Sequence, residues 1–191
     1  MGRLPGDSVN HVSAARASND EGHMVHNSAS SDRKIYLASP LGFAHSTHAF
    51  MTDVVKALRE VITVINPWDD VRFAGQFAQI ASVDSVAERE RRLAEINREL
   101  GRANTQSILE SDGVFAVLDG VDVDSGTAAE IGFGFAHGKR VYGLRTDFRL
   151  AGDNAGSLVN LQVQYFIEAS GGSIVTTMHE FISLADHFAQ E

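Results

Sequence analysis

The 191-residue chain has no cysteine, few basic residues and no long apolar run, and each absence excludes a class of protein. Without cysteine there is no disulfide, thiolate nucleophile or cysteine-ligated metal. Only 16 Lys and Arg stand against 25 Asp and Glu, for a net charge of -9, which argues against a nucleic-acid-binding surface. No run approaches the roughly 20 apolar residues that span a bilayer. With no secretory signal pattern in the first 32 residues, we expect a cytoplasmic protein without membrane contact.

Length and composition favour one globular domain with a tail. Residues 1–32 are rich in Ser, Asn, Gly, His and Asp and lack helical or strand periodicity, so we predict a disordered N-terminal tail. Residues 33–191 are enough for a single domain with a full core, and too few for two.

Short apolar runs alternate with helical patterns along residues 33–191. The runs predict strands at 34–39, 62–65, 114–118, 140–144 and 173–175, and the helical patterns fall at 46–61, 84–110, 127–137, 157–169 and 178–188. Because parallel neighbours need crossover connections, this alternation predicts an α/β fold with a doubly wound, five-stranded parallel sheet. Residues 68–83 show no clear period and are predicted to form a long loop.

The stretch 113–139 reads as a strand, an acidic turn and a helix, which places Glu130 one turn into the helix. Loops at the carboxyl ends of parallel strands form the ligand crevice. A carboxylate near a helix N-terminus is held ionised, and an ionised carboxylate is a nucleophile for an acetal-like carbon. The same residues also match a capping box from Thr127 to Glu130, in which Glu130 merely caps the helix.

Other residues of this stretch can be interpreted either structurally or functionally. Asp124 is either an acceptor for sugar hydroxyls or a helix N-cap. The small residues near it, Gly126 among them, leave space for a ligand or a close-packed neighbour. The glycines 132, 134 and 138 lie inside the helix and lack dinucleotide-loop spacing, which favours helix packing. No His and carboxylate set has metal-ligand spacing, so we expect no metal.

Several short motifs resemble the nucleoside 2-deoxyribosyltransferases. The resemblance runs from about residue 34 to 191 and is strongest in one block, residues 124–132 (DSGTAAEIG). Three shorter matches accompany it, namely Tyr36-Leu37-Ala38 with its loop, Asn104 eight residues before Asp112, and Asn160-Leu161-Gln162.

The resemblance implies a flavodoxin-like domain of nucleotide salvage that exchanges the base of a 2'-deoxynucleoside through a covalent intermediate, without cofactor or metal. It implies that Glu130 is the nucleophile, that Tyr36 orients it and that Asn104 lies near the base and the catalytic centre. Asp124 would hold the deoxyribose hydroxyls. Asn160 would reach a neighbouring subunit's site, which makes the protein a homo-oligomer. The partners implied are small 2'-deoxynucleosides and free nucleobases.

Alternatives remain open at this point. Water in place of a second base would make the protein an N-glycosidase on deoxynucleosides or their monophosphates. A non-catalytic nucleotide-binding module with the same fold is a third possibility, since fold does not fix function. Trp68, the only tryptophan, either stacks on a base or has an ordinary packing role.

Overall fold

The computed structural model describes residues 32–191, so the tail predicted at 1–32 lies, except for residue 32, outside the described residues. Five strands are formed: β1 (Lys34–Ala38), β2 (Thr63–Ile65), β3 (Gly113–Val117), β4 (Arg140–Leu144) and β5 (Ile174–Val175). Six α-helices connect and follow them: α1 (His48–Arg59), α2 (Val71–Ala81), α3 (Val86–Glu110), α4 (Ser125–Ala136), α5 (Leu161–Ala169) and α6 (Met178–Gln190). Two short 3₁₀ turns, His45–Thr47 and Pro67–Asp69, precede α1 and α2.

The strands form one parallel sheet in the order β2-β1-β3-β4-β5. This confirms the predicted doubly wound α/β fold, and the order is that of flavodoxin-like domains. The order reverses between β1 and β3, and such a switch point is where open α/β sheets bind ligands.

Alternating side chains of the central strands feed two cores. On one face, Ile35 and Leu37 of β1 join Phe115 of β3 under helices α1 and α6. On the other face, Tyr36 of β1 and Val114 of β3 lie under α3, α4 and α5. Burial on both faces explains why the strands read as continuous apolar runs rather than as alternating ones.

Capping side chains decide where the helices begin. Helix α3 starts after Ser85, whose hydroxyl accepts from the Glu88 amide, as expected for a helix over 84–110. Helix α4 starts two residues earlier than predicted because Asp124, not Thr127, is its N-cap. Helix α5 starts at Leu161 rather than residue 157, because Asn160 caps it.

The loop predicted at 68–83 is wrong, because most of it is helix α2. Asp70 caps this helix by accepting from the Arg72 amide. Its buried residues Phe73 and Ile80 pack against Ile96 of α3 in a small separate core. The helical spacing 73, 77, 80 was present in the sequence, but Gly75 and the exposed Val71 obscure it.

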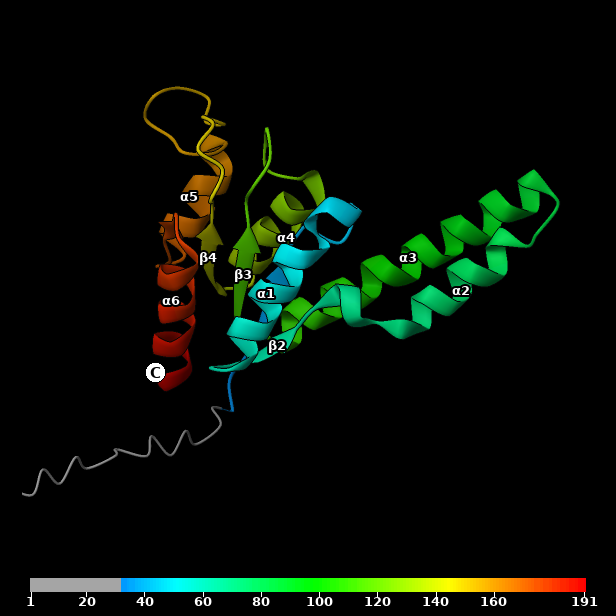
Figure 1. The fold of residues 1–191 in the computed structure, drawn as a ribbon, viewed down its shortest axis with the longest axis horizontal. Coiled ribbons are helices and arrows are strands. Elements are labelled where there is room, and N and C mark those ends of the chain that lie inside the picture. The colour runs from blue at the N-terminus through cyan, green and yellow to red at the C-terminus, as the bar shows by residue number, and fades with distance from the viewer. Residues whose placement is uncertain (1–31) are drawn as a thin grey trace, which may run out of the picture.

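Helices α2 and α3 form a hairpin that projects from one side of the sheet (Figure 1). At a rise of 1.5 Å per residue, the 25 residues of α3 extend about 37 Å. Its C-terminal part lies against the sheet, whereas its N-terminal part packs on α2 alone (Figure 1). Within residues 32–191, no helix combines the length and apolar character needed to cross a membrane.

Glycine in α4 allows the helix to approach the sheet closely. A Cβ on Gly134 would come within 2.7 Å of a Val114 methyl group, and one on Gly132 within 3.3 Å of the Phe166 ring. Gly138 follows the helix with φ of +71°, the left-handed conformation that ends helices. The expected packing role is therefore confirmed for Gly132 and Gly134, whereas Gly138 lies beyond the helix and has no close neighbour to pack against.

Gly134→Ala is expected to destabilise the fold by about 1–3 kcal/mol, because the buried valine beneath it has no room to move. Gly101→Ala is the matched control, since a Cβ at that exposed position of α3 meets nothing within 4 Å. It should stabilise the fold by up to about 1 kcal/mol through helix propensity. Urea denaturation of both variants measures the difference, and equal effects would contradict the close approach of α4.

Candidate active site

The candidate site lies at the carboxyl ends of β1 and β3, where the strand order reverses. Glu130 of α4 is at its centre. One oxygen of its carboxylate, Oε1, accepts a 2.6 Å hydrogen bond from the Tyr36 hydroxyl and a 3.2 Å bond from the Asn104 amide. Three elements, β1, α3 and α4, thus hold one carboxylate in place.

The capping-box interpretation of Glu130 is wrong. Because Asp124 caps α4, Glu130 lies in the second turn of the helix, too far from its start to cap it. The helix macrodipole acts mainly within the first turn. It therefore favours ionisation of Glu130 less than the sequence suggested.

Burial raises the pKa of Glu130 above its ordinary value, and the nearby Asp124 charge adds to this. The hydrogen bonds from Tyr36 and Asn104 act in the opposite direction. Burial and the Glu130 carboxylate also raise the pKa of Tyr36 far above its usual range. Tyr36 is therefore a neutral hydrogen-bond donor, and the Oε1 atom of Glu130 is its acceptor.

A cavity of about 420 Å³ opens in front of Glu130. This volume is within the range of small-molecule sites. Five apolar side chains from α2, α3 and two loops form much of its wall: Phe43, Trp68, Phe73, Phe77 and Leu100. The polar and small lining includes Ser39, Asn97, Asn104, Asp124, Gly126 and Thr127.

Asp124 has a structural role and also faces the cavity. Its Oδ2 accepts from the amide and the hydroxyl of Thr127, at 3.0 and 3.3 Å. Asp124 is thus the N-cap of α4 and also part of the cavity wall, and its contact with sugar hydroxyls stays a prediction. A Cβ on Gly126 would lie 3.1 Å from Oδ2, so glycine leaves this oxygen uncrowded.

Trp68 also packs and lines the cavity at the same time. Its indole N–H donates to the Ser39 carbonyl at 2.9 Å, and its ring meets Phe43 edge-on with centroids 4.7 Å apart. A Cβ on Gly42 would fall 2.1 Å from the indole, so the tryptophan can occupy this position only because residue 42 is glycine.

Most of the other acidic residues of the 113–139 stretch lie away from the cavity. Asp119 accepts from the amides of Thr146 and Asp147 and from the Thr146 hydroxyl, at 2.6–2.8 Å. Asp122 bonds the amide of Val123. Among residues 32–191, no three His, Asp or Glu side chains gather as a metal site would require.

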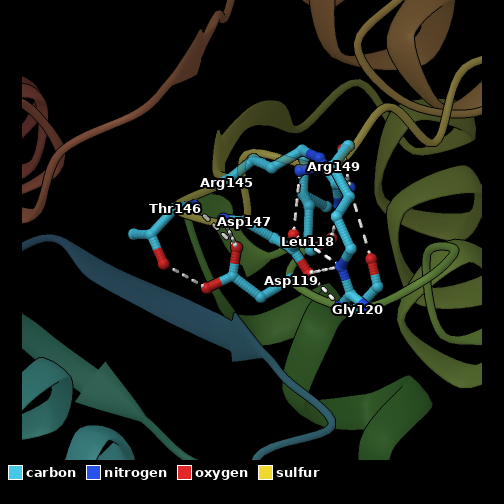
Figure 2. Close-up of polar contacts among 7 residues, drawn as sticks. All are labelled: Leu118, Asp119, Gly120, Arg145, Thr146, Asp147 and Arg149. Carbon is cyan, nitrogen blue, oxygen red and sulfur yellow. Dashed lines mark hydrogen bonds and ion pairs between the residues drawn. The ribbon is translucent and has the colours of Figure 1, made fainter.

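Arg145 ties together the loops that follow β3 and β4 (Figure 2). Its side chain is almost fully buried, and it donates to the carbonyls of Leu118, Gly120 and Arg149 at 2.6, 3.2 and 2.8 Å. Together with the contacts of Asp119, these bonds join the loop after β3 to the loop after β4. The loop after β3 leads directly to Asp124, so this cluster fixes the start of α4.

Comparison with known proteins identifies the family. A protein-family model described as nucleoside 2-deoxyribosyltransferase matches residues 35–162, about two thirds of the chain. The chain belongs to this family. No curated protein matches.

Solved structures of nucleoside 2-deoxyribosyltransferases have the same fold. A 2-deoxyribosyltransferase from Bacillus psychrosaccharolyticus is 21% identical, with a TM-score of 0.54, 77% of this chain and 88% of that one covered. One from Leishmania mexicana is 19% identical, with a TM-score of 0.54 and coverage of 83% and 98%. A conserved protein from Enterococcus faecalis V583 is 23% identical, with a TM-score of 0.58 and coverage of 82% and 98%.

The structure brings together most of the residues that the family resemblance singles out. Glu130 and Asn104 line the cavity, and Tyr36 lies behind Glu130, fully buried. Asn160 does not line the cavity of its own chain. Its side chain caps α5 by accepting from the amides of Gln162 and Val163, so its implied contact with a neighbouring subunit stays a prediction.

Apart from Trp68, the apolar half of the cavity wall was not predicted from the sequence. Phe73 and Phe77 belong to α2, which was predicted as a loop, and Asn97 and Leu100 belong to the part of α3 that pairs with it. The signal was available in the spacing of 97, 100 and 104, which places all three on one face of a helix.

Tyr36→Phe is expected to raise the pKa of Glu130, because it removes the hydrogen bond that favours the carboxylate while leaving the site buried. Titration of ¹³C-labelled glutamate side chains by NMR would record the shift. Tyr165→Phe on the exposed face of α5 is the control. An unchanged titration of Glu130 would contradict the arrangement.

Arg145→Met is expected to destabilise the fold by about 2–4 kcal/mol, because three carbonyls lose a charged donor in a buried place. Arg102→Met, at an exposed position of α3, should change stability by no more than about 0.5 kcal/mol. Urea denaturation measures both. Equal small effects would show that the cluster does not hold the loops.

Proposed function

We propose that this chain transfers the 2-deoxyribosyl group of a 2'-deoxynucleoside from one nucleobase to another, with Glu130 as nucleophile. The observation that carries the proposal is the position of Glu130. Its carboxylate is held by Tyr36 and Asn104 at the wall of a cavity whose other side is aromatic. Membership of the nucleoside 2-deoxyribosyltransferase family supports the same reaction.

The first half-reaction forms a glycosyl ester. An oxygen of the Glu130 carboxylate bonds to C1' of the donor while the C1'–N bond breaks. The electron pair of that bond leaves with the base, which takes up a proton from solvent. Tyr36 and Asn104 keep the carboxylate aimed at C1', and Tyr36 acts only through Glu130, because it is fully buried.

The second half-reaction releases the ester. A nitrogen of the acceptor base bonds to C1', the C1'–O bond breaks, and Glu130 regains its charge. The acceptor's N–H proton passes to solvent. Two inversions give net retention, as in retaining glycosidases. Both halves balance without an oxidant, reductant or metal, so we propose that none is required.

Asp124 is proposed to bind the sugar hydroxyls. Its Oδ2 is engaged with Thr127, whereas its Oδ1 accepts no hydrogen bond from residues 32–191. A free carboxylate oxygen next to Glu130 suits the hydroxyls of deoxyribose. We further propose, from the family resemblance, a homo-oligomer in which Asn160 approaches the site of a neighbouring subunit.

The charges of the lining favour nucleosides over their monophosphates. The charged side chains that line the cavity in the described chain are all acidic: Asp70, Asp124 and Glu130. No lysine or arginine of residues 32–191 lines it to neutralise a phosphate. Arg72, the cation beside Asp70, is paired with that carboxylate.

Glu130→Gln should abolish base exchange while the fold is retained, with a loss of at least about a thousandfold. Glutamine keeps an acceptor for Tyr36 and Asn104 but cannot form the ester. The assay incubates deoxyinosine with adenine and follows deoxyadenosine by chromatography. Glu99→Gln, at an exposed position of α3, is the control and should retain full activity.

Each other outcome of this assay identifies an alternative. Release of hypoxanthine without deoxyadenosine would indicate an N-glycosidase that uses water in the second step. Binding of deoxyinosine without any reaction of the unmutated chain would indicate a nucleotide-binding module. Full activity of Glu130→Gln would remove Glu130 from the mechanism.

A further inference from the structure

The proposed function fixes which part of the cavity receives the base. In the displacement at C1', the nucleophile and the departing base lie on opposite sides of the carbon. With Glu130 on one side, the base must occupy the part of the cavity farthest from it. That part is bounded by α2 and the middle of α3.

One face of α3 runs along this part of the cavity. Asn104, Leu100 and Asn97 follow each other at spacings of four and three residues, and all three line the cavity. Asn104 marks the inner end, because it bonds Glu130. Asn97 lies seven residues away, about 10 Å along the helix axis. The base region is therefore long, with an amide at its outer end.

The walls between the two ends suit a flat ring. Trp68, Phe73 and Phe77 enclose this region, and aromatic side chains bind flat rings by stacking or edge contacts. Phe77 and Trp68 each remain more than a third exposed, so a bound ring would cover apolar surface now open to water.

Asn97 is the polar residue of this region whose side chain is not engaged with another residue of the described chain. Its side chain makes no hydrogen bond with any residue of the described chain, 32–191. Asn104 is already bonded to Glu130, and Asp70 to Arg72. A carboxamide offers a donor and an acceptor together, and this pair matches the N1 acceptor and N6 donor on the edge of adenine that lies away from the sugar.

From this arrangement we infer that Asn97 reads the far edge of the base, and that the site prefers purines to pyrimidines. A fused two-ring base extends farther from C1' than a single ring does, and so brings its edge within reach of Asn97. A pyrimidine leaves the amide unpaired. The inference rests on the proposed function for the placement of the base.

The single tryptophan allows a binding test that needs no turnover. Trp68 lines the base region, so a bound base should change its fluorescence. Adenine and thymine would be titrated into the unmutated chain, into Asn97→Ala and into Arg98→Ala. Arg98 is the exposed neighbour on α3 that does not line the cavity.

The expected result is tighter binding of adenine than of thymine, by about five- to a hundredfold, the discrimination that one bidentate amide contact provides. Asn97→Ala should lose this advantage and bind thymine as before, and Arg98→Ala should keep it. The kcat/KM values for deoxyadenosine and thymidine as donors should follow the same pattern.

Two results would overturn the inference and are distinct from failure of the proposed function. Equal binding of the two bases would remove the purine preference, and an equal loss for both bases in Asn97→Ala would make Asn97 merely structural. If base exchange proceeds in either case, the proposed function stands. If no base binds and no exchange occurs, both fail.

Discussion

The hydrogen bond between Tyr36 and Glu130 is the contact on which the rest of the site depends. It joins the central strand β1 to α4, across 94 residues of sequence, through a phenol that has no exposed surface. A buried hydroxyl and a partly buried carboxylate each cost free energy unless they find a partner. Here the hydroxyl and the carboxylate are each other's partner. One hydrogen bond therefore links the packing of α4 on the sheet to the orientation of the carboxylate. Asn104 of α3 then adds a third element to it.

The strands could be predicted, because a strand buried on both faces leaves a continuous apolar run, as β4 does over Arg140–Leu144. Helix starts were less predictable where two capping residues compete: Asp124 and Thr127 both fit α4, and only the folded chain decides between them. The meeting of Tyr36, Asn104 and Glu130 could be expected from the family resemblance alone, since no local pattern links a strand residue to helices so distant in sequence. The contribution of Phe73 and Phe77 to the apolar wall could not be expected once α2 was taken for a loop.

The α2–α3 hairpin explains how a small domain obtains a large apolar cavity. The sheet and its covering helices bury most of their large apolar side chains in two cores. The hairpin has only a small core of its own, and its two aromatic side chains, Phe73 and Phe77, line the cavity in front of Glu130. The Glu130 carboxylate therefore belongs to α4, which packs on the sheet, and the surface proposed to face the base belongs to the projecting hairpin (Figure 1). Substitutions in α2 can change the cavity wall without removing a hydrogen bond of Glu130, because Tyr36 and Asn104 belong to β1 and α3.

The hydrogen bonds of Arg145 differ from an ordinary ion pair in their response to acid and salt. The side-chain donors of Arg145 are bonded to three backbone carbonyls, which do not titrate and carry no net charge. Salt screens a pair of opposite exposed charges, and acid neutralises such a pair by protonating its carboxylate. Neither effect breaks a hydrogen bond between a buried guanidinium and a backbone carbonyl. The hydrogen bonds from Arg145 to the loop that leads to Asp124 are thus insensitive to acid and to ionic strength. Glu130, less than 10 residues further along the chain, can still titrate.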